Sequence, residues 1–211
     1  MGVISLRVLE IQFHEVLQPA KDLIKIHKRN PSQGRRVADL SLNKGAVVFA
    51  VAAWQAYVQS LTEEILVSLA PPPSDLSAGV YQLLGARVRD RIRRFNTPNA
   101  RNTVELFGLV GFDPRPGWAL TLEWERQFSK VNGSMKSKTN LTRSDTAKEL
   151  DAWLLVRHRI AHGDTLPKDS ERVSGTDRGK PQLMRKNADR CVGFFDALVR
   201  ATADEVRRAI P

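Results

Sequence analysis

The chain has 211 residues, 42% of them hydrophobic and 27% charged, and 33 Lys and Arg against 23 Asp and Glu give a formal net charge of +10. Such a chain can bury roughly 70% of its unfolded surface in one domain, and its excess of cations favours polyanionic partners such as nucleic acid or an anionic membrane surface. The single cysteine excludes an internal disulfide, and no apolar run reaches the roughly 18 residues of a membrane span. Because the N-terminus also lacks a signal-peptide pattern, we expect a cytoplasmic protein.

The first half of the chain predicts three long helices. Residues 3–28 carry a broad apolar stripe, and residues 42–69 are apolar around most of the helix circumference, which predicts a central helix with several neighbours. A Pro- and Gly-containing loop at 30–36 separates the two. Residues 76–95 form a third helix, with an apolar stripe expected to face the core through Val80, Leu83, Leu84, Val88, Ile92 and Phe95.

The third predicted helix also carries a row of arginines opposite its apolar stripe. Arg87, Arg91 and Arg94 follow one another at four- and three-residue steps and therefore share a face. Such a row of guanidinium groups fits a phosphate backbone, and it equally fits an ordinary solvated basic face. Lys136 and Lys138, in a polar segment at 132–140 that we expect to be an exposed loop, are further candidates for RNA contacts.

The second half of the chain predicts short helices at 99–110 and 118–131, followed by a long helix from a capping box at Thr142 to Gly163. A mobile loop is expected at 165–181, and a long helix at 182–210 closes the chain. Cys191 lies in the apolar stripe of the closing helix, which indicates a buried and inert thiol. No strand-like alternation bounded by hairpin signals is apparent. We therefore predict an all-α fold, an antiparallel helical bundle of four to five long helices with short inserted helices.

Potential chemistry is concentrated at residues 150–164, whose sequence is LDAWLLVRHRIAHGD. The apolar residues of this stretch follow the spacing of an amphipathic helix, and Arg157, His158, Arg159 and His162 are interleaved with them. His162 is expected in the last helical turn before Gly163, where the carbonyl dipoles favour a cationic imidazole. His158 and His162 project to one side of the helix, whereas Arg157 lies about 140° away from His162.

Histidine and arginine together meet the needs of RNA cleavage without a metal ion. The reaction needs a base for the 2′-hydroxyl proton, an acid for the leaving 5′-oxygen and positive charge at the phosphorus. Imidazole exchanges protons near neutral pH, and guanidinium binds phosphate oxygens with a planar fork. Arg157, His158 and His162 are therefore candidate catalytic residues, and Arg159 is a candidate RNA-binding residue. We assign no metal site and no cofactor, since His14 and His27 lack partners at metal-ligand spacing.

The order Arg157, His158, three further residues, His162 and Gly163 resembles the Arg-polar-x-His motif of the HEPN superfamily. The hydrophobic segment AVAAWQAYVQSLTEEIL, followed later by a motif helix ending in IAHG, is similar in layout to the RiboL-PSP type of HEPN domain. On this resemblance residues 1–211 form a single HEPN-like helical domain. The segment at about 99–140 is an insertion relative to a minimal HEPN domain.

The resemblance implies a metal-independent endoribonuclease in which two copies of the chain form a homodimer and line a shared cleft for RNA. Arg157 and His162 would be the motif pair, with His158 as the intervening polar residue. Many HEPN domains act as toxins or in phage defence, often beside an antitoxin or another regulatory partner protein.

Two other classes of function stay open on the sequence. A non-catalytic nucleic-acid-binding or regulatory helical module would explain the charge and the fold, with Arg157 and His162 as structural hydrogen-bonding residues. A metal-dependent hydrolase using His158 and His162 is the weaker alternative, because Arg159 stands where an HExxH motif needs its glutamate.

Overall fold

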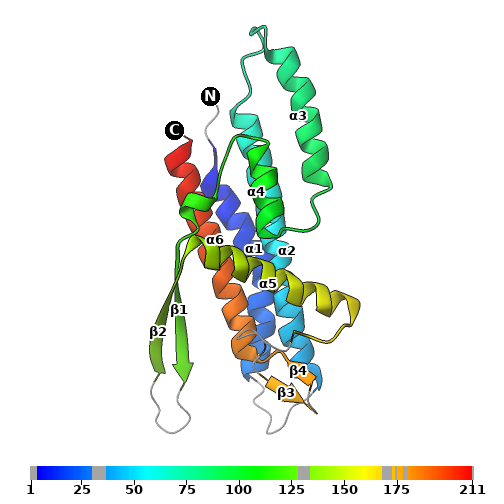
Figure 1. The fold of residues 1–211 in the computed structure, drawn as a ribbon, viewed down its shortest axis with the longest axis vertical. Coiled ribbons are helices and arrows are strands. Elements are labelled where there is room, and N and C mark those ends of the chain that lie inside the picture. The colour runs from blue at the N-terminus through cyan, green and yellow to red at the C-terminus, as the bar shows by residue number, and fades with distance from the viewer. Residues whose placement is uncertain are drawn as a thin grey trace.

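Three long helices form the centre of the computed structural model, which describes residues 4–29, 37–127, 134–167, 173, 175–177 and 180–210. They are α1 (Leu6–Arg29), α2 (Val37–Ser68) and α6 (Arg185–Ala209). Figure 1 shows α1 running opposite to α2 and α6, which share one direction because the intervening segment returns the chain to the end where α2 began. The loop predicted at 30–36 lies outside the described residues.

Helix α2 is the central helix that its all-round apolarity predicted. It packs against α1, α6, α5, α3 and α4, and its small residues Ala46, Ala50 and Ala53 are fully buried. Small side chains let neighbouring helices approach α2 closely, while Trp54 fills the core and donates from Nε1 to the backbone oxygen of Pro98 over 3.2 Å. The core is thus organised around one helix with neighbours on several sides.

Three further helices pack on this centre: α3 (Ala78–Arg93), α4 (Ala100–Gly108) and α5 (Arg143–His162). The predicted all-α fold, a helical bundle of four to five long helices, is confirmed. No helix in the described part of the chain is both long and apolar enough to cross a membrane.

The apolar stripe predicted for α3 is only partly buried. Tyr81, Gly85, Val88 and Ile92 face α2, at the four- and three-residue steps of one helix side. Val80, Leu83 and Leu84, which the sequence placed toward the core, are 62%, 63% and 52% exposed. That expectation was wrong because α3 packs along α2 on one side (Figure 1), and the flank that carries these three residues is left exposed.

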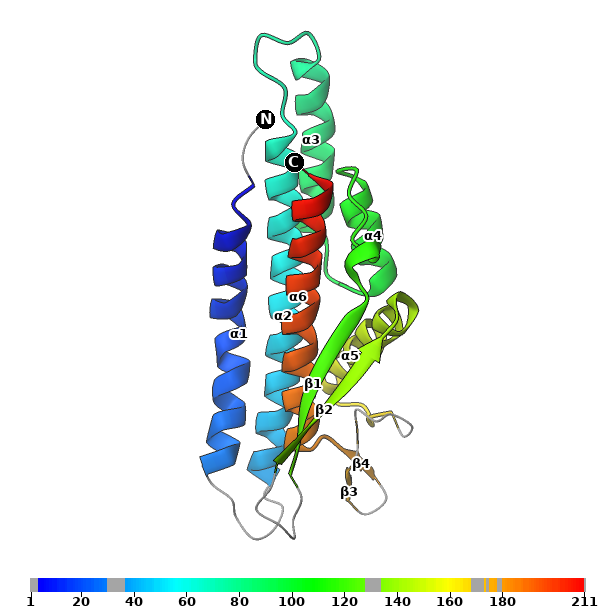
Figure 2. The same ribbon diagram turned by 90° about the vertical axis from the view of Figure 1, so that its left-hand side faces the viewer.

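A β-hairpin replaces the helix predicted at 118–131 and the loop predicted at 132–140. Strands β1 (Leu120–Gln127) and β2 (Ser134–Leu141) pair antiparallel, with Leu122 opposite Thr139 and Glu123 opposite Lys138. Leu120 and Leu122 are buried whereas Thr121 and Glu123 are exposed, so the segment has the two-residue period of a strand packed on one face. The hairpin follows the lower half of α6 (Figure 2), where that buried face is covered.

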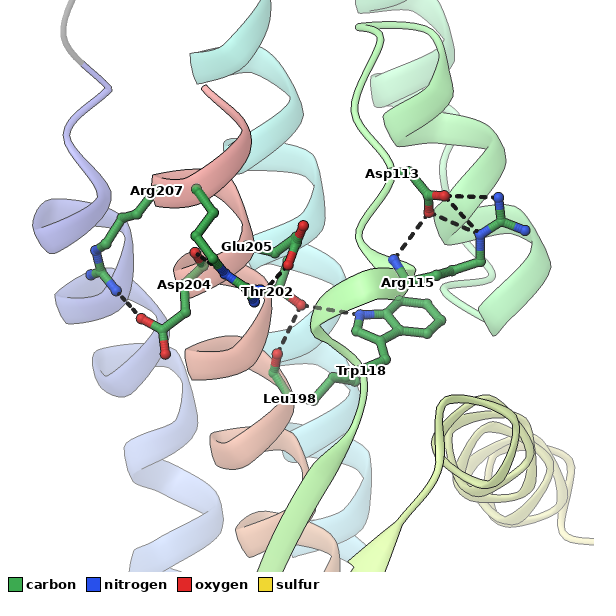
Figure 3. A network of polar contacts seen from close by, with 9 residues as sticks. Asp113, Arg115, Trp118, Leu198, Thr202, Asp204, Glu205 and Arg207 are labelled. Atoms are coloured by element: carbon green, nitrogen blue, oxygen red, sulfur yellow. Dashed lines mark hydrogen bonds and ion pairs between the residues drawn. The ribbon is translucent and has the colours of Figure 1, made fainter. Parts of the chain in front are cut away.

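The 3-10 turn η1 (Arg115–Gly117) fastens the start of the hairpin to α6. Trp118 is buried and donates from Nε1 to Thr202 Oγ1 over 3.3 Å, and Thr202 donates in turn to the backbone oxygen of Leu198 (Figure 3). A Cβ atom on Gly117 would lie 2.6 Å from the backbone oxygen of Ala201. Only glycine therefore permits this close approach of the turn to α6.

The segment after α5, predicted as a mobile loop at 165–181, contains ordered elements. Strands β3 (Gly175–Asp177) and β4 (Lys180–Gln182) form a second small hairpin, and Leu166 and Val173 are buried at 6% exposure each. Two buried apolar side chains therefore hold this part of the chain against the core, next to the end of α5.

Candidate functional site at the end of α5

Helix α5 positions the candidate catalytic residues, and both of its ends are capped. Thr142 Oγ1 accepts a hydrogen bond from the backbone N–H of Asp145, whose carboxylate accepts one from the backbone N–H of Thr142, as the predicted capping box requires. At the other end Gly163 has a φ of 70°, and the backbone N–H groups of Gly163 and Asp164 donate to Ile160 and Arg159. This Schellman arrangement makes His162 the last residue of the helix.

His158 and His162 lie together on the exposed side of α5, as their four-residue spacing predicted. Their ring centroids are 4.3 Å apart, with the ring planes inclined at 51°. Both side chains are exposed, and so is Leu155, one turn before His158 on the same side of the helix and 45% exposed. Leu155 was not among the predicted site residues, although its three-residue step to His158 marks it as a neighbour on the helix.

Arg157 occupies a different side of the helix, as the angular offset predicted. It is half-buried, one turn after the fully buried Trp153. Arg157 makes no ion pair with any residue that the structure describes. A guanidinium at the edge of the core with no carboxylate beside it has its donors available for an anion.

Arg159 is already paired within the chain. Its Nη1 atom lies 3.2 Å from Oδ2 of Asp164, and its backbone oxygen accepts from the N–H of the same residue. Arg159 therefore helps to cap the C-terminal end of α5. An RNA phosphate would have to compete with the Asp164 carboxylate for the Arg159 guanidinium. Sequence reasoning passed over Asp164, although a carboxylate directly after the helix-ending glycine is well placed to meet a cation in the last turn.

The remaining residues proposed to contact RNA lie on other elements. Arg87 and Arg91 are exposed on α3, and Arg94 is exposed at its C-cap. Helix α3 stands beside the upper part of α2, whereas α5 crosses α2 lower down (Figure 1). Arg94 pairs with Asp90 over 3.1 Å, and Lys138 pairs with Glu123 across the hairpin over 3.1 Å. The side chain of Lys136 lies outside the described residues. The structure does not bring these cations to the end of α5, and their contact with RNA stays a prediction.

Two features elsewhere in the molecule are separate from the α5 site. A groove of about 400 Å³ between α1, α2 and α3 is lined by residues such as Gln12, Gln59 and Glu63 and includes no residue of the motif.

His27 Nδ1 lies 2.9 Å from Oδ1 of the buried Asn43, and His14 lies 3.5 Å from Asp196. Within the described ranges no group of three His, Cys, Asp or Glu side chains could hold a metal ion.

Cys191 lies in the core, as the apolar pattern of the closing helix predicted. It is fully buried, and burial together with the neighbouring Glu149 raises the pKa of its thiol well above the ordinary value. A thiol held protonated and out of contact with solvent is not a nucleophile. The exposed polar groups at the end of α5 are therefore the better candidates for chemistry.

Comparison with known protein families supports the resemblance to HEPN domains that the sequence indicated. Searches of curated proteins and of solved structures gave no match. The family model described as RiboL-PSP-HEPN matches residues 13–207, a range that runs from α1 through the motif helix to the last turns of α6. Since this match covers most of the chain, the protein belongs to the RiboL-PSP-HEPN family.

Proposed function

We propose that this protein is a metal-independent endoribonuclease of the HEPN type, with Arg157, His158 and His162 as its catalytic residues. HEPN domains include ribonucleases, so a nuclease or an RNA-related module is the coarse expectation from the family. The observation that carries the finer proposal is the pair of exposed imidazoles 4.3 Å apart at the capped end of α5. Arg157 directly precedes His158 and makes no ion pair with any described residue.

The proposed reaction uses the 2′-hydroxyl of RNA as the nucleophile. A neutral imidazole takes the hydroxyl proton while the 2′-oxygen forms a bond to phosphorus, and the bond from phosphorus to the 5′-oxygen breaks as an imidazolium protonates that oxygen. The products are a 2′,3′-cyclic phosphate and a free 5′-hydroxyl, so no oxidant or metal ion is consumed. Arg157 would neutralise the negative charge that builds on the phosphoryl oxygens.

One copy of the chain supplies only part of this arrangement, which leads us to propose a two-fold homodimer. In-line displacement places the base and the acid on opposite sides of the phosphorus. His158 and His162 lie on the same side of α5, so one helix brings imidazoles to one flank of the phosphate. A second α5 related by a two-fold axis would supply the other flank, and the exposed Leu155 beside the histidines offers apolar area for that contact.

RNA is the proposed substrate because the molecule carries a formal charge of +10, which raises the local concentration of a polyanion. We further propose that the protein acts in the cytoplasm, where a free buried cysteine is common, as a toxin or phage-defence effector. A ribonuclease site exposed to solvent in this way needs restraint, for which an antitoxin or another regulatory partner protein is the expected means.

The test is cleavage of total RNA by the purified protein in excess EDTA. The native chain should cut RNA and leave 2′,3′-cyclic phosphate ends, and His162→Ala should lose activity by a factor of about 10² or more, the usual contribution of a general acid or base. His14→Ala is the matched control, since His14 lies on α1 beside Asp196 and outside the motif. It should cut at the native rate.

Two outcomes would overturn the proposal. Loss of cleavage in EDTA with recovery on adding zinc or magnesium would assign the reaction to a metal ion. Binding of RNA without cleavage, unchanged in His162→Ala, would assign the domain to the non-catalytic nucleic-acid-binding class.

A further inference from the structure

Helix α3 is held to the molecule along one side only. The hydroxyl of Tyr81 donates to the backbone oxygen of Leu66, and Arg89 Nε lies 2.8 Å from Oε1 of Glu63, so contacts along this side run to α2. Ile92 completes the packed side with 8% exposure. Figures 1 and 2 both show α3 at the end of the molecule beyond α1 and α6. Its outer circumference is therefore open to a partner.

The first half of this open circumference is apolar. Val80, Leu83 and Leu84 share one flank of the helix by their three- and four-residue steps and are each more than half exposed. Leu76, in the turn that leads into α3, is also fully exposed. A cluster of exposed aliphatic side chains marks a binding site, because covering them with a partner removes apolar surface from water.

The second half of the same flank is cationic and unneutralised. Arg87 follows Leu83 by four residues, and Arg91 follows Arg87 by four, which keeps them in line with the leucines. The other arginines of this segment lie beside acidic residues of the chain: Arg89 pairs with Glu63, and Arg93 and Arg94 share the single carboxylate of Asp90. By contrast, Arg87 and Arg91 make no ion pair with another described residue.

We propose that the α3 flank, defined as Val80, Leu83, Leu84, Arg87 and Arg91, docks an acidic amphipathic helix of a partner protein. The flank is a straight stripe about 17 Å long on one side of one helix. Its complement is a helix of about three turns, with aliphatic residues in its first half and carboxylates in its second half, each at three- or four-residue steps. The net charge of +10 also favours an acidic partner, because opposite charges attract across an interface.

Three other occupants fit the α3 flank less well. A second copy of this chain would place arginines against arginines in a parallel pair, or against leucines in an antiparallel one. A helix bound to an anionic membrane lies in its plane with the cations on the side opposite the apolar residues, whereas Arg87 and Arg91 lie on the same side of α3 as the leucines. RNA would use Arg87 and Arg91 but would leave the aliphatic side chains exposed to water.

The test measures fluorescence anisotropy with two designed helical peptides of about 18 residues. Both peptides carry the same leucines in one half, and their other half presents either Glu or Lys at the same positions. The native protein should bind the Glu peptide in preference to the Lys peptide at about 0.15 M salt. Arg87→Glu combined with Arg91→Glu should weaken binding of the Glu peptide at least about tenfold and strengthen binding of the Lys peptide. Leu83→Ser combined with Leu84→Ser should weaken both.

The matched control is Arg93→Glu, an arginine of the same helix outside the flank, which should bind both peptides as the native protein does. All substituted side chains are exposed, and circular dichroism should show native helix content in each variant. The proposal is wrong if the native protein does not bind the Glu peptide, or if Arg93→Glu loses binding as strongly as the double reversal.

Alternative occupants would each leave their own result. Tighter binding of phosphatidylserine vesicles or of single-stranded RNA than of the Glu peptide, lost on Arg87→Glu with Arg91→Glu, would assign the flank to that polyanion. Self-association abolished by Leu83→Ser with Leu84→Ser would assign it to a second copy of this chain. Either result would overturn the proposal of an acidic helix and leave the ribonuclease proposal for α5 untouched.

Discussion

At the scale of single residues, Gly163 determines where the motif helix ends and therefore where His162 lies. Its φ of 70° belongs to the left-handed region, and this turn aligns the backbone N–H groups of Gly163 and Asp164 with the last carbonyls of α5. Any residue with a Cβ atom is strained in that conformation, by roughly 1–2 kcal/mol. The position of a catalytic imidazole thus depends on a residue that carries no functional group.

We predict that Gly163→Ala lowers the free energy of unfolding by about 1–2 kcal/mol, as the strain of a left-handed alanine requires. The measurement is the midpoint of urea unfolding followed by circular dichroism. Gly108→Ala is the control, because Gly108 ends α4 without a positive φ and a Cβ atom there would meet nothing within 4 Å. It should leave stability unchanged or slightly increased, and equal losses in both variants would contradict this account.

At the scale of elements, α5 depends on the capping box at its start. The side-chain hydrogen bond from Thr142, followed by the backbone one, lowers the pKa of the Asp145 carboxyl below its ordinary value of 3.8. A carboxyl whose pKa is lower in the folded state stabilises the fold fully above its unfolded pKa, and this contribution is lost as the pH falls through the folded pKa. The cap is therefore strongest near neutral pH.

We predict that Thr142→Ala destabilises the protein by about 1 kcal/mol near pH 7, the usual loss for an N-cap. The penalty should shrink below about pH 4, since the native protein then loses the charged partner of the cap. Urea unfolding of both chains at about pH 7 and about pH 3.5 measures this. Asn99→Ala removes the cap of α4, which uses a neutral amide on the N–H of Asn102, and its penalty should not change with pH. A constant penalty for Thr142→Ala would show that the charge of Asp145 plays no part.

At the scale of the whole molecule, the site proposed for RNA cleavage is an exposed helix end. His158, His162 and Leu155 share one exposed side of α5, and the groove between α1, α2 and α3 lies elsewhere. Enclosing a phosphate at this helix end therefore calls for a second surface. A two-fold copy is the simplest source of one, because it brings the missing imidazoles together with a second Arg157.

We predict that mixing His162→Ala chains with Arg157→Ala chains restores part of the cleavage that each variant lacks. A heterodimer of the two would hold one intact His162 and one intact Arg157 in the shared cleft. Activity of the mixture is compared with that of each variant alone, and sedimentation at micromolar concentration gives the oligomeric state. A native protein that is monomeric in sedimentation and still cuts RNA at its full rate would exclude the composite site.

Features that depend on neighbours in sequence could be predicted from the sequence. The periodicity of apolar residues predicted α1, α2 and α6, because a helix repeats every 3.6 residues whatever it packs against. The same local rules predicted the box at Thr142 and Asp145, the end of α5 at Gly163 and the shared side of His158 and His162. The family and the motif were accessible for this reason too, since both are patterns along one helix.

Only the tertiary structure decided which side of each element meets a partner. The alternation of Leu120, Thr121 and Leu122 suits a strand, but so short a segment also suits an amphipathic helix. The contact of the buried face with α6 in the structure distinguishes the two. The leucines of α3 are exposed because they lie on a flank of the helix that does not face α2. Pairing of Arg89 with Glu63 and of Lys138 with Glu123 likewise joins residues far apart in the sequence, and charge alone does not reveal which cations remain free for a ligand.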